Sequence, residues 1–500
     1  MDNKKSESSN SLLSIIEHLT IVSLTGIAFC AIGYFLFFQW LSYQEYLELR
    51  GVMPAMLSVI GFMYAIYRAV PLLEDFWGLK RSRINTDHPF CVYAAIAMWL
   101  IFINSIIIAF GYSMEGSVSF SSMLENFFGR YGNDTPHYIA IAERWYQDTL
   151  DYHRRNIVFF PFYPILIRIA FFVSPSYLFA AYAVSNIFAL AGGIMFYKLA
   201  VAVTDVKEAR LAVKFLLIFP SAFFLFVPMT ESLFLFLSVG VVYYSIKEKY
   251  LWVFILGLMA ALTRSVGILL IIPAACELIG QLRQRHQGSQ ETFTGILQRL
   301  IAENSDSINI NVQLRLPLRA MWVHIANTLR NLTRIDKLNL ASLLAFPLGI
   351  GIYLFINYAV YGSATQFLVF QEIHWGQELY FFWHTITYLT SDMFTAYRNW
   401  AIGVSLPGVI AFWLCLALII YGARKLRPSL TLYALAYFIF AFGPTWLMSG
   451  PRYVMVLFPL AFVAAKIAGT KKGYNLFLTI AYLAMFVLYF HEFVRDNFVF

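Results

Sequence analysis

The chain has little charge and few polar segments. Only 13% of its 500 residues are Asp, Glu, Lys or Arg, whereas 60% are hydrophobic. A soluble globular domain carries about a quarter charged residues, so this composition excludes an ordinary soluble fold. The longest polar interval, 281–337, is too short to build a hydrophobic core of its own. The composition therefore predicts a polytopic membrane protein.

Cysteine is scarce as well, and the thiols have neither metal-binding nor disulfide spacing. The four cysteines, in or beside apolar runs, are Cys30, Cys91, Cys276 and Cys415. Without a CxxC pair or a loop framework, they exclude a thiolate metal site and a disulfide scaffold. His374 and His384 also lack the HExxH spacing of a zinc site. No cofactor is expected, and no pattern supports a divalent metal.

The net charge of +8 does not imply a nucleic-acid partner, because the basic residues lie in short loops between apolar runs. Such loops face the cytoplasm by the positive-inside rule. With the N-terminal tail inside, the basic loop at 80–83 also falls inside, and the loop 113–156 falls outside. The tail has no small-residue cleavage site before a short apolar run, so it is expected to be retained.

Two of the apolar runs contain features that interrupt a straight membrane helix. The run 157–173 carries two prolines and Arg168, and is expected to bend or to enter and leave on one side. The run 250–279 is expected to break at Thr263 and Arg264, which keeps the basic connector inside. With these exceptions, the apolar runs predict about 11–13 transmembrane or re-entrant helices.

Four regions follow from this pattern. They are a cytoplasmic tail with two extra N-terminal helices at 1–89, a core at 90–279 with the loop 113–156, a cytoplasmic connector at 280–337, and C-terminal helices at 338–500 with the outer loop 362–400. The extra N-terminal helices are a candidate docking surface for a protein partner.

The polar stretch YGNDTPHYIAIAERWY, at 131–146, lies in the outer loop. Pro136 is favoured in a first helical turn, and an apolar stripe beginning at Tyr138 predicts a short amphipathic helix on the membrane surface. The side chain of Asp134 or Thr135 would cap that helix. A carboxylate at this position would equally serve as a general base, and spacing does not decide between the two roles.

Other charged residues interrupt apolar sequence. Glu231, in VPMTES, must be paired, hydrated or functional, or must cap the helix that follows. Arg264, in ALTRSVG, costs at least about 2.5–3.5 kcal/mol in an apolar run and is expected to face water or an anion. Arg155 and Arg452, at the borders of apolar runs, would anchor the protein in headgroups or bind a phosphate.

The outer loop 362–400 adds polar and aromatic candidates. The stretch FQEIHWGQ contains Gln371, His374 and Trp375. By the expected topology, these residues lie on the same side of the membrane as Asp134, Glu231 and Arg452. The polar residues therefore gather on one face.

The order of these motifs resembles a known family. The succession NDTPHYIAIAERWY, IVFFPFYPILIR, PSAFFLFVPMTESLFLFLS, ALTRSVGILLIIP, QEIHW and GPRYVMVLFPL is similar to that of the PIG-V mannosyltransferases and their prokaryotic relatives, which are GT-C glycosyltransferases. The resemblance covers about 90–465. It implies an all-α polytopic membrane protein with a GT-C fold and a cavity for a polyprenyl- or dolichyl-phosphate sugar.

Carried over onto this chain, the family's acidic residue falls on Asp134, which is implied to deprotonate the acceptor hydroxyl. The resemblance and the charges together imply a set of donor- or substrate-binding residues: His137, Tyr138, Arg155, Glu231, Arg264, Gln371, His374, Trp375 and Arg452. Asn133 stands where the family has tryptophan, and Gln377 replaces a basic residue, so acceptor identity and phosphate contacts stay open.

The implied reaction transfers a hexose, most simply mannose, from the lipid phosphate to an extracytoplasmic hydroxyl with inversion. A glycosylation sequon at Asn133 favours a prokaryotic plasma membrane over the endoplasmic reticulum, because a glycan there would obstruct the site. Two alternatives remain. One is a flippase or transporter of lipid-linked saccharides, in which Glu231 and Arg264 would lie on the transport path. The other is a catalytically inactive scaffold.

Overall fold

The computed structural model describes residues 89–113, 119–129, 134–146, 155–285, 293–303, 332–397, 400–444, 447 and 449–494. The expected N-terminal tail and extra helices lie outside these residues, as does Asn133. Within the described part of the chain, no strand occurs, and the one β contact is an isolated bridge between Leu379 and Pro444. The expectation of an all-α protein is confirmed.

Among the residues that the structure describes, six helical segments are long and apolar enough to cross a membrane. They are formed by α4 (Pro89–Ser113), α9 (Tyr177–Val203), η4 with α13 (Ser265–Leu270 and Ile271–Arg285), α16 with η5 and α17 (Arg334–Ala341, Ser342–Leu344 and Ala345–Tyr361), η6 with α21 (Ala401–Ser405 and Leu406–Gly422), and α25 (Lys472–Val494). Large apolar side chains on their outer faces, such as Phe355, Trp413 and Ile420, are exposed, as expected where lipid is the solvent. The chain is a multi-pass membrane protein.

Shorter helices complete the bundle. The apolar ones are α8 (Phe162–Phe171), α11 (Glu231–Ile246), α12 (Tyr250–Ala261), α22 (Pro428–Ala441) and α24 (Pro459–Thr470). The others are α5 (Phe120–Phe128), α6 (Thr135–Arg144), η2 (Arg155–Val158), α10 (Val206–Leu217), η3 (Ala222–Leu225), α14 (Phe293–Glu303), α18 (Gln366–Trp375), α19 (Phe382–Thr395) and α23 (Gly450–Met455).

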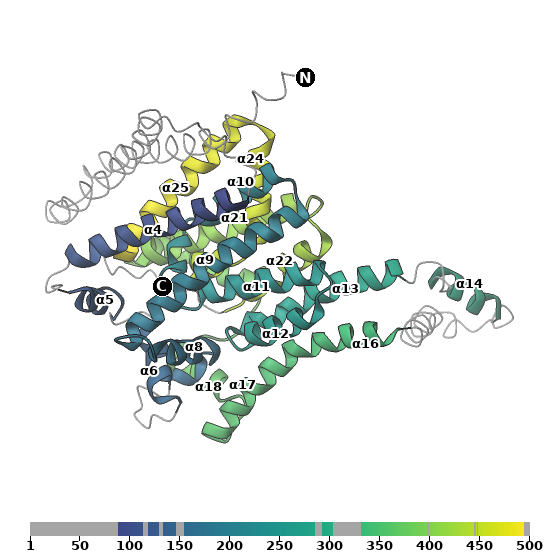
Figure 1. Ribbon diagram of the computed structural model, residues 1–500, viewed down its shortest axis with the longest axis horizontal. Coiled ribbons are helices and arrows are strands. Elements are labelled where there is room, and N and C mark those ends of the chain that lie inside the picture. The colour runs from purple at the N-terminus through teal and green to yellow at the C-terminus, as the bar shows by residue number, and fades with distance from the viewer. Residues whose placement is uncertain are drawn as a thin grey trace, which may run out of the picture.

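The long helices run side by side, and α9 packs along α11 at the centre of the bundle (Figure 1). Helices α5, α6, α8 and α18 gather at one end of it, hereafter the α6 end, on the left of the picture. Helices α13 and α16 extend toward the opposite end. The bundle therefore has two ends, and the helices formed by the expected outer loops lie together at the α6 end.

The run 157–173 does not form a membrane-crossing helix, as expected. It begins as the short η2, bends at Pro161 and continues as α8. With 10 residues, α8 is about 15 Å long, roughly half the thickness of a hydrocarbon core. Arg168, in its last turn, is exposed, in agreement with a residue that reaches toward headgroups.

The run 250–279 is broken where expected. Helix α12 ends at Ala261, the chain turns through Thr263 and Arg264, and η4 then packs back against α12. The backbone N–H of Phe162 donates to the Leu262 carbonyl at 3.0 Å, so the two broken runs meet directly. Arg264 is thereby held at a chain reversal between helices.

The reversal depends on Gly267. A Cβ atom at this position would lie 2.2 Å from the Ala260 carbonyl oxygen, which is backbone and cannot rotate away. Gly267→Ala is therefore expected to lower the free energy of unfolding by about 1–3 kcal/mol, the usual cost of overpacking. Thermal unfolding of the purified protein in detergent would measure it.

Gly280 is the matched control for Gly267. It lies in α13, and a Cβ atom there would have no neighbour within 4 Å. Because alanine favours a helix over glycine by about 1 kcal/mol or less, Gly280→Ala is expected to leave the melting temperature unchanged or slightly raised. Equal melting temperatures for both variants would contradict the tight reversal.

The expected boundaries of the connector fall inside helices. Helix α13 continues past 279 to Arg285, and α16 begins at Arg334, before the expected start at 338. Arg285 donates to Asp336 at 2.8 Å, and this contact links the two ends of the connector. The connector also contains a described helix, α14. The interval 280–337 is therefore continuous with the bundle at both of its ends.

Candidate active site

Asp134 lies immediately before α6, and its side chain does not cap that helix. Its backbone carbonyl accepts from the N–H groups of His137 at 3.1 Å and Tyr138 at 3.3 Å, but its carboxylate makes no capping hydrogen bond. Instead, Oδ2 accepts from Nη2 of Arg452 at 2.6 Å. The capping role for this side chain is wrong, and the carboxylate is directed into the protein.

The apolar face of α6 packs against protein. Tyr138 and Ile141 are buried, and the Tyr138 ring meets the edges or faces of Phe159 and Tyr163 with centroids 5.1 and 5.2 Å away. Trp145 ends the helix at a φ of 59° and is half-buried. The expected helix exists, and its apolar stripe packs against η2, α8 and α9.

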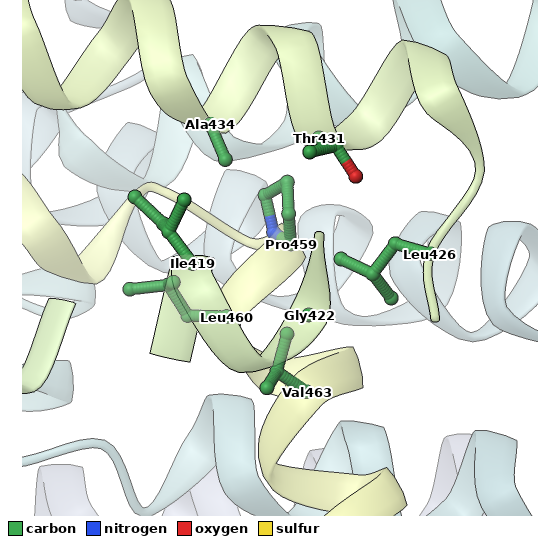
Figure 2. A pocket seen from close by; sticks show the side chains of 8 residues that line it. All are labelled: Ile419, Gly422, Leu426, Thr431, Ala434, Pro459, Leu460 and Val463. Carbon is green, nitrogen blue, oxygen red and sulfur yellow. The ribbon is translucent and has the colours of Figure 1, made fainter. Parts of the chain in front are cut away.

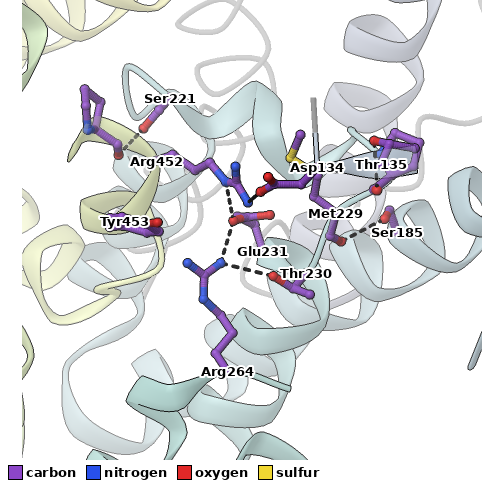
Figure 3. Close-up of polar contacts among 12 residues, drawn as sticks. Asp134, Thr135, Ser185, Ser221, Met229, Thr230, Glu231, Arg264, Arg452 and Tyr453 are labelled. Carbon is purple, nitrogen blue, oxygen red and sulfur yellow. Dashed lines mark hydrogen bonds and ion pairs between the residues drawn. The ribbon is translucent and has the colours of Figure 1, made fainter. Parts of the chain in front are cut away.

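Four charged side chains form one network at the α6 end (Figure 3). Glu231 Oε1 accepts from Arg452 Nε at 2.6 Å and from Arg264 Nη1 at 2.5 Å. Arg264 Nη1 also reaches the Thr230 hydroxyl at 3.1 Å, so Thr230, like Glu231, does not serve as a side-chain cap of α11. The order of contacts is Asp134, Arg452, Glu231, Arg264. Residues from four separate motifs therefore form a single chain of ion pairs.

Burial differs along the network. The side chains of Glu231 and Arg452 are 0% and 4% exposed, whereas Asp134 is 28% and Arg264 12% exposed. Within the described part of the chain, Asp134 Oδ1 and the Nε and Nη2 groups of Arg264 have no partner, and they are not sealed from solvent. The network thus ends in an accessible carboxylate oxygen on one side and accessible guanidinium donors on the other.

The network is electrically balanced. Two carboxylates and two guanidinium groups sum to zero, which is the condition under which buried charges are tolerated in a membrane protein. Aromatic faces add to it, because Arg452 lies over the Phe224 ring at 5.6 Å and Arg264 over the Tyr453 ring at 5.2 Å. Arg452 is therefore a buried charge, and of its two expected roles the interfacial anchor is wrong.

Side-chain hydrogen bonds to backbone fix the segments that carry these charges. Thr135 and Ser185 donate to the carbonyls of Pro228 and Met229, each at 3.2 Å, just before Thr230. Ser221 donates to the Pro451 carbonyl at 2.6 Å, next to Arg452 (Figure 3). The turns before Glu231 and Arg452 are held by neighbouring helices, so the geometry of the network is preorganised.

An aromatic group adjoins the network. His137 stacks on Phe159 with centroids 4.8 Å apart, and Trp375 approaches both rings at 6.3 and 6.0 Å. Nδ1 of His137 lies 2.8 Å from Oδ1 of the buried Asn156. Asn156 was missed by the sequence interpretation, although a lone amide at the start of an apolar run is a signal for a buried polar contact.

The remaining predicted residues lie outside the network. Gln371 donates to the Gln377 side chain at 2.8 Å, and His374 packs on Phe370 with centroids 5.4 Å apart. Gln371, His374 and Trp375 all belong to α18. Of these three residues, Trp375 is the one that contacts the rings of His137 and Phe159. Arg155 begins η2, but the position of its side chain lies outside the described structure.

Elsewhere in the described part of the chain there is one further pocket of note, and it is small. Figure 2 shows a small pocket between α21, α22 and α24, where the Thr431 hydroxyl is the polar group of an otherwise apolar lining. It offers no set of groups for chemistry. In the described ranges, no three His, Cys, Asp or Glu side chains converge as a metal site would require. The network at the α6 end is the candidate active site.

No protein-family model matches the chain, and no curated protein matches it significantly. The function must therefore be inferred from the residues of the site.

Proposed function

We propose that the protein is an integral-membrane glycosyltransferase of the GT-C class. It transfers a hexose, most simply mannose, from a polyprenyl- or dolichyl-phosphate donor to an extracytoplasmic hydroxyl. The α6 end faces the outside, in a prokaryotic plasma membrane or, alternatively, the lumen of the endoplasmic reticulum. The observation that carries the proposal is that one balanced network ends in an accessible carboxylate, that of Asp134, and in accessible guanidinium donors, those of Arg264.

The reaction is a single displacement. The acceptor O–H gives its proton to Oδ1 of Asp134 while its oxygen forms a bond to the anomeric carbon of the sugar. The bond from that carbon to the phosphate oxygen breaks, and its electron pair leaves with the lipid phosphate. Attack opposite to the leaving group inverts the anomeric configuration. The step consumes no redox equivalent.

Charge balance links the base to the leaving group. When Asp134 takes the proton, the network loses one negative charge and changes from neutral to +1. At the same moment the phosphodiester becomes a phosphomonoester and gains one negative charge. The excess positive charge of Arg452 and Arg264 thus develops together with the negative charge on the leaving phosphate. It therefore stabilises the transition state more than the bound substrate.

Asp134 is the preferred base among the acidic groups of the site. Glu231 is fully buried, with its Oε1 committed to both arginines, so its role is to position them. Tyr138 remains protonated, because burial, reinforced by the Asp134 carboxylate, raises the pKa of its phenol. A protonated phenol donates hydrogen bonds but does not remove a proton. Asp134 alone combines negative charge with access.

The placement of the charges favours an enzyme over a transporter. Asp134 and Glu231 lie at helix starts, Arg264 lies in a chain reversal, and Arg452 belongs to the six-residue α23. Transport sites lie near the bilayer midplane between long or interrupted helices. A set of charges at helix ends, beside the loop helices α6 and α18, fits chemistry at a membrane surface better.

Sugar transfer by the purified protein tests the proposal. The protein in liposomes would be given polyprenyl-phosphate mannose labelled in the sugar, together with extracted membrane lipids and glycans as acceptors. The expected result is label in a new product that requires active protein. If folded protein transferred no label from mannosyl, glucosyl or galactosyl lipid phosphates, the proposed function would be wrong.

A further inference from the structure

Lys214 is a half-buried charge whose hydrogen-bond partners are neutral. It lies in the last turn of α10, and its ammonium group donates to Oδ1 of Asn475 at 2.5 Å and to Oγ1 of Thr479 at 2.8 Å, both in α25. The Phe215 ring lies 4.5 Å from the same nitrogen. Burial lowers the pKa of the amine to about 8, so the amine remains mostly charged at neutral pH. An ammonium group has three donors, so one is left after these two hydrogen bonds.

The carboxylates of α10 are committed to other groups. Glu208 pairs with Lys466 of α24 at 2.8 Å, and Asp205 caps α10 through the Glu208 N–H at 2.8 Å. Among the described residues, no acidic side chain forms an ion pair with Lys214. The network at the α6 end, in contrast, balances its buried charges. An unbalanced ammonium group is costly in a membrane protein, so an anion is expected beside Lys214.

Two more lysines lie one helical turn from this contact. Lys472 begins α25, and the Asn475 N–H donates to the Lys471 carbonyl at 3.2 Å, so both lysines precede Asn475 by one turn. Side chains three or four positions apart are neighbours on a helix. Both lysines are exposed, and the first turn of α25 has no acidic residue. Three positive charges therefore lie around the contact between α10 and α25.

These lysines lie at the end of the bundle away from α6, where α10, α24 and α25 come together (Figure 1). Helix α9 starts beside α8 and, with 27 residues, is about 40 Å long, and α10 starts at Val206 and packs back along it. Lys214 lies about 12 Å along α10 from its start, a depth from which a lysine stem reaches the headgroups. In the proposed orientation this end is cytoplasmic, where anionic lipids gather at basic sites between helices.

Apolar side chains border the lysines. Leu476 and Phe477, which directly follow Asn475, are 49% and 68% exposed. On a membrane protein, exposed large apolar side chains at helix surfaces are covered by acyl chains. A ligand bound at the lysines can therefore be a lipid whose chains lie on α25.

We propose that Lys214, Lys471 and Lys472 bind the phosphate of an anionic membrane phospholipid. The Lys214 ammonium donates to a phosphate oxygen, the two exposed lysines add charge, and the acyl chains lie on Leu476 and Phe477. A free phosphate ion would use the same charges but would leave the apolar side chains uncovered. The site is separate from the candidate active site, and the inference does not depend on the proposed function.

Lipid retention by the purified protein tests the inference. The protein in a neutral detergent would be given phosphatidylglycerol or phosphatidylcholine with identical acyl chains, and bound lipid would be counted by native mass spectrometry. Phosphatidylglycerol is expected to bind at least about 10-fold more tightly, because each basic residue contributes about fivefold at an anionic headgroup, and to raise the melting temperature. Equal retention of the two lipids, or equal stabilisation by inorganic phosphate, would overturn the lipid assignment.

Variants of the three lysines locate the site. Lys214→Met keeps most of the side-chain volume and is expected to weaken phosphatidylglycerol binding about 5-fold or more. Lys471→Gln combined with Lys472→Gln changes only exposed side chains, so the fold should be unaffected, and binding should weaken by at least about 5-fold. Unchanged phosphatidylglycerol binding in the double variant would contradict the site even if Lys214→Met did not fold.

Arg424→Gln combined with Lys425→Gln is the matched control. It removes two exposed positive charges from the turn after α21, away from the contact between α10 and α25. Phosphatidylglycerol binding should change by less than about twofold. If both double variants lost binding equally, the lipid would be attracted by net charge alone, and the assignment to Lys214, Lys471 and Lys472 would be wrong.

Discussion

Asp134→Asn is expected to lower kcat for sugar transfer by about 10² or more, the usual contribution of a general base. The amide oxygen can still accept from Arg452, so the ion-pair geometry changes little, but the amide cannot take a proton. The melting temperature should fall, but less than for a substitution of the fully buried Glu231, because Asp134 is partly exposed and Arg452 keeps Glu231 as a counter-charge. Steady-state kinetics at matched amounts of folded protein would measure the effect.

The charge balance adds a sharper expectation for this variant. Asp134→Asn leaves the network at +1, so the KM for the anionic donor should stay the same or fall even as kcat falls. A helix cap or a donor-binding carboxylate would not produce this split. A kcat near that of the unaltered protein would remove Asp134 from the mechanism, and a rise in donor KM alone would make it a binding residue.

Asp205→Asn provides the comparison for a carboxylate that does cap a helix. Asp205 precedes α10, is exposed, and accepts from the Glu208 N–H at 2.8 Å. Because asparagine caps a helix nearly as well as aspartate, the substitution should change stability by about 1 kcal/mol or less and leave activity unchanged. Both aspartates immediately precede a helix, but only Asp205 caps it with its side chain, so the comparison separates the effect of a lost cap from the effect of a lost base.

Glu231→Gln is expected to lower the free energy of unfolding by about 3–5 kcal/mol, since it leaves buried arginine charge without its counter-charge. Both Arg264 and Arg452 lose their shared carboxylate, while the side chain keeps its volume. Loss of transfer should accompany the loss of stability, because the two guanidinium groups are no longer held in place. Thermal or denaturant unfolding in detergent would measure the change.

An exposed ion pair is the control for Glu231. Glu248 pairs with Arg285 but is 47% exposed, so Glu248→Gln should cost about 0–1 kcal/mol. Adding Arg264→Gln to Glu231→Gln returns the network to neutrality, and the double variant should be less destabilised than the sum of the two single changes. Additive effects, or equal costs for Glu231→Gln and Glu248→Gln, would contradict a coupled buried network.

The sequence contained enough information for the breaks in the two apolar runs and for the four charged residues of the site. A proline or an arginine inside apolar sequence interrupts a membrane helix for local reasons. The end of α12 and the short length of α8 could therefore be expected. The pairing of these charged residues with one another could not be predicted. Asp134 and Arg452 are 318 positions apart, and which arginine meets which carboxylate depends on how the helices pack.

Local patterns also left choices that only packing decides. An aspartate before a proline precedes a helix in either role, so spacing could not show that the Asp134 carboxylate turns away from α6. In α18, Gln371 and Trp375 lie in one motif, but Trp375 joins the aromatic group whereas Gln371 bonds Gln377.

The stereochemistry of transfer tests the central claim most directly. The protein in liposomes would be given polyprenyl-phosphate mannose of known anomeric configuration and octyl mannopyranoside, and the labelled product would be digested with α- and β-specific mannosidases. A single displacement with Asp134 as base predicts a product of the configuration opposite to that of the donor. A product that retained the donor's configuration would contradict this account of the site.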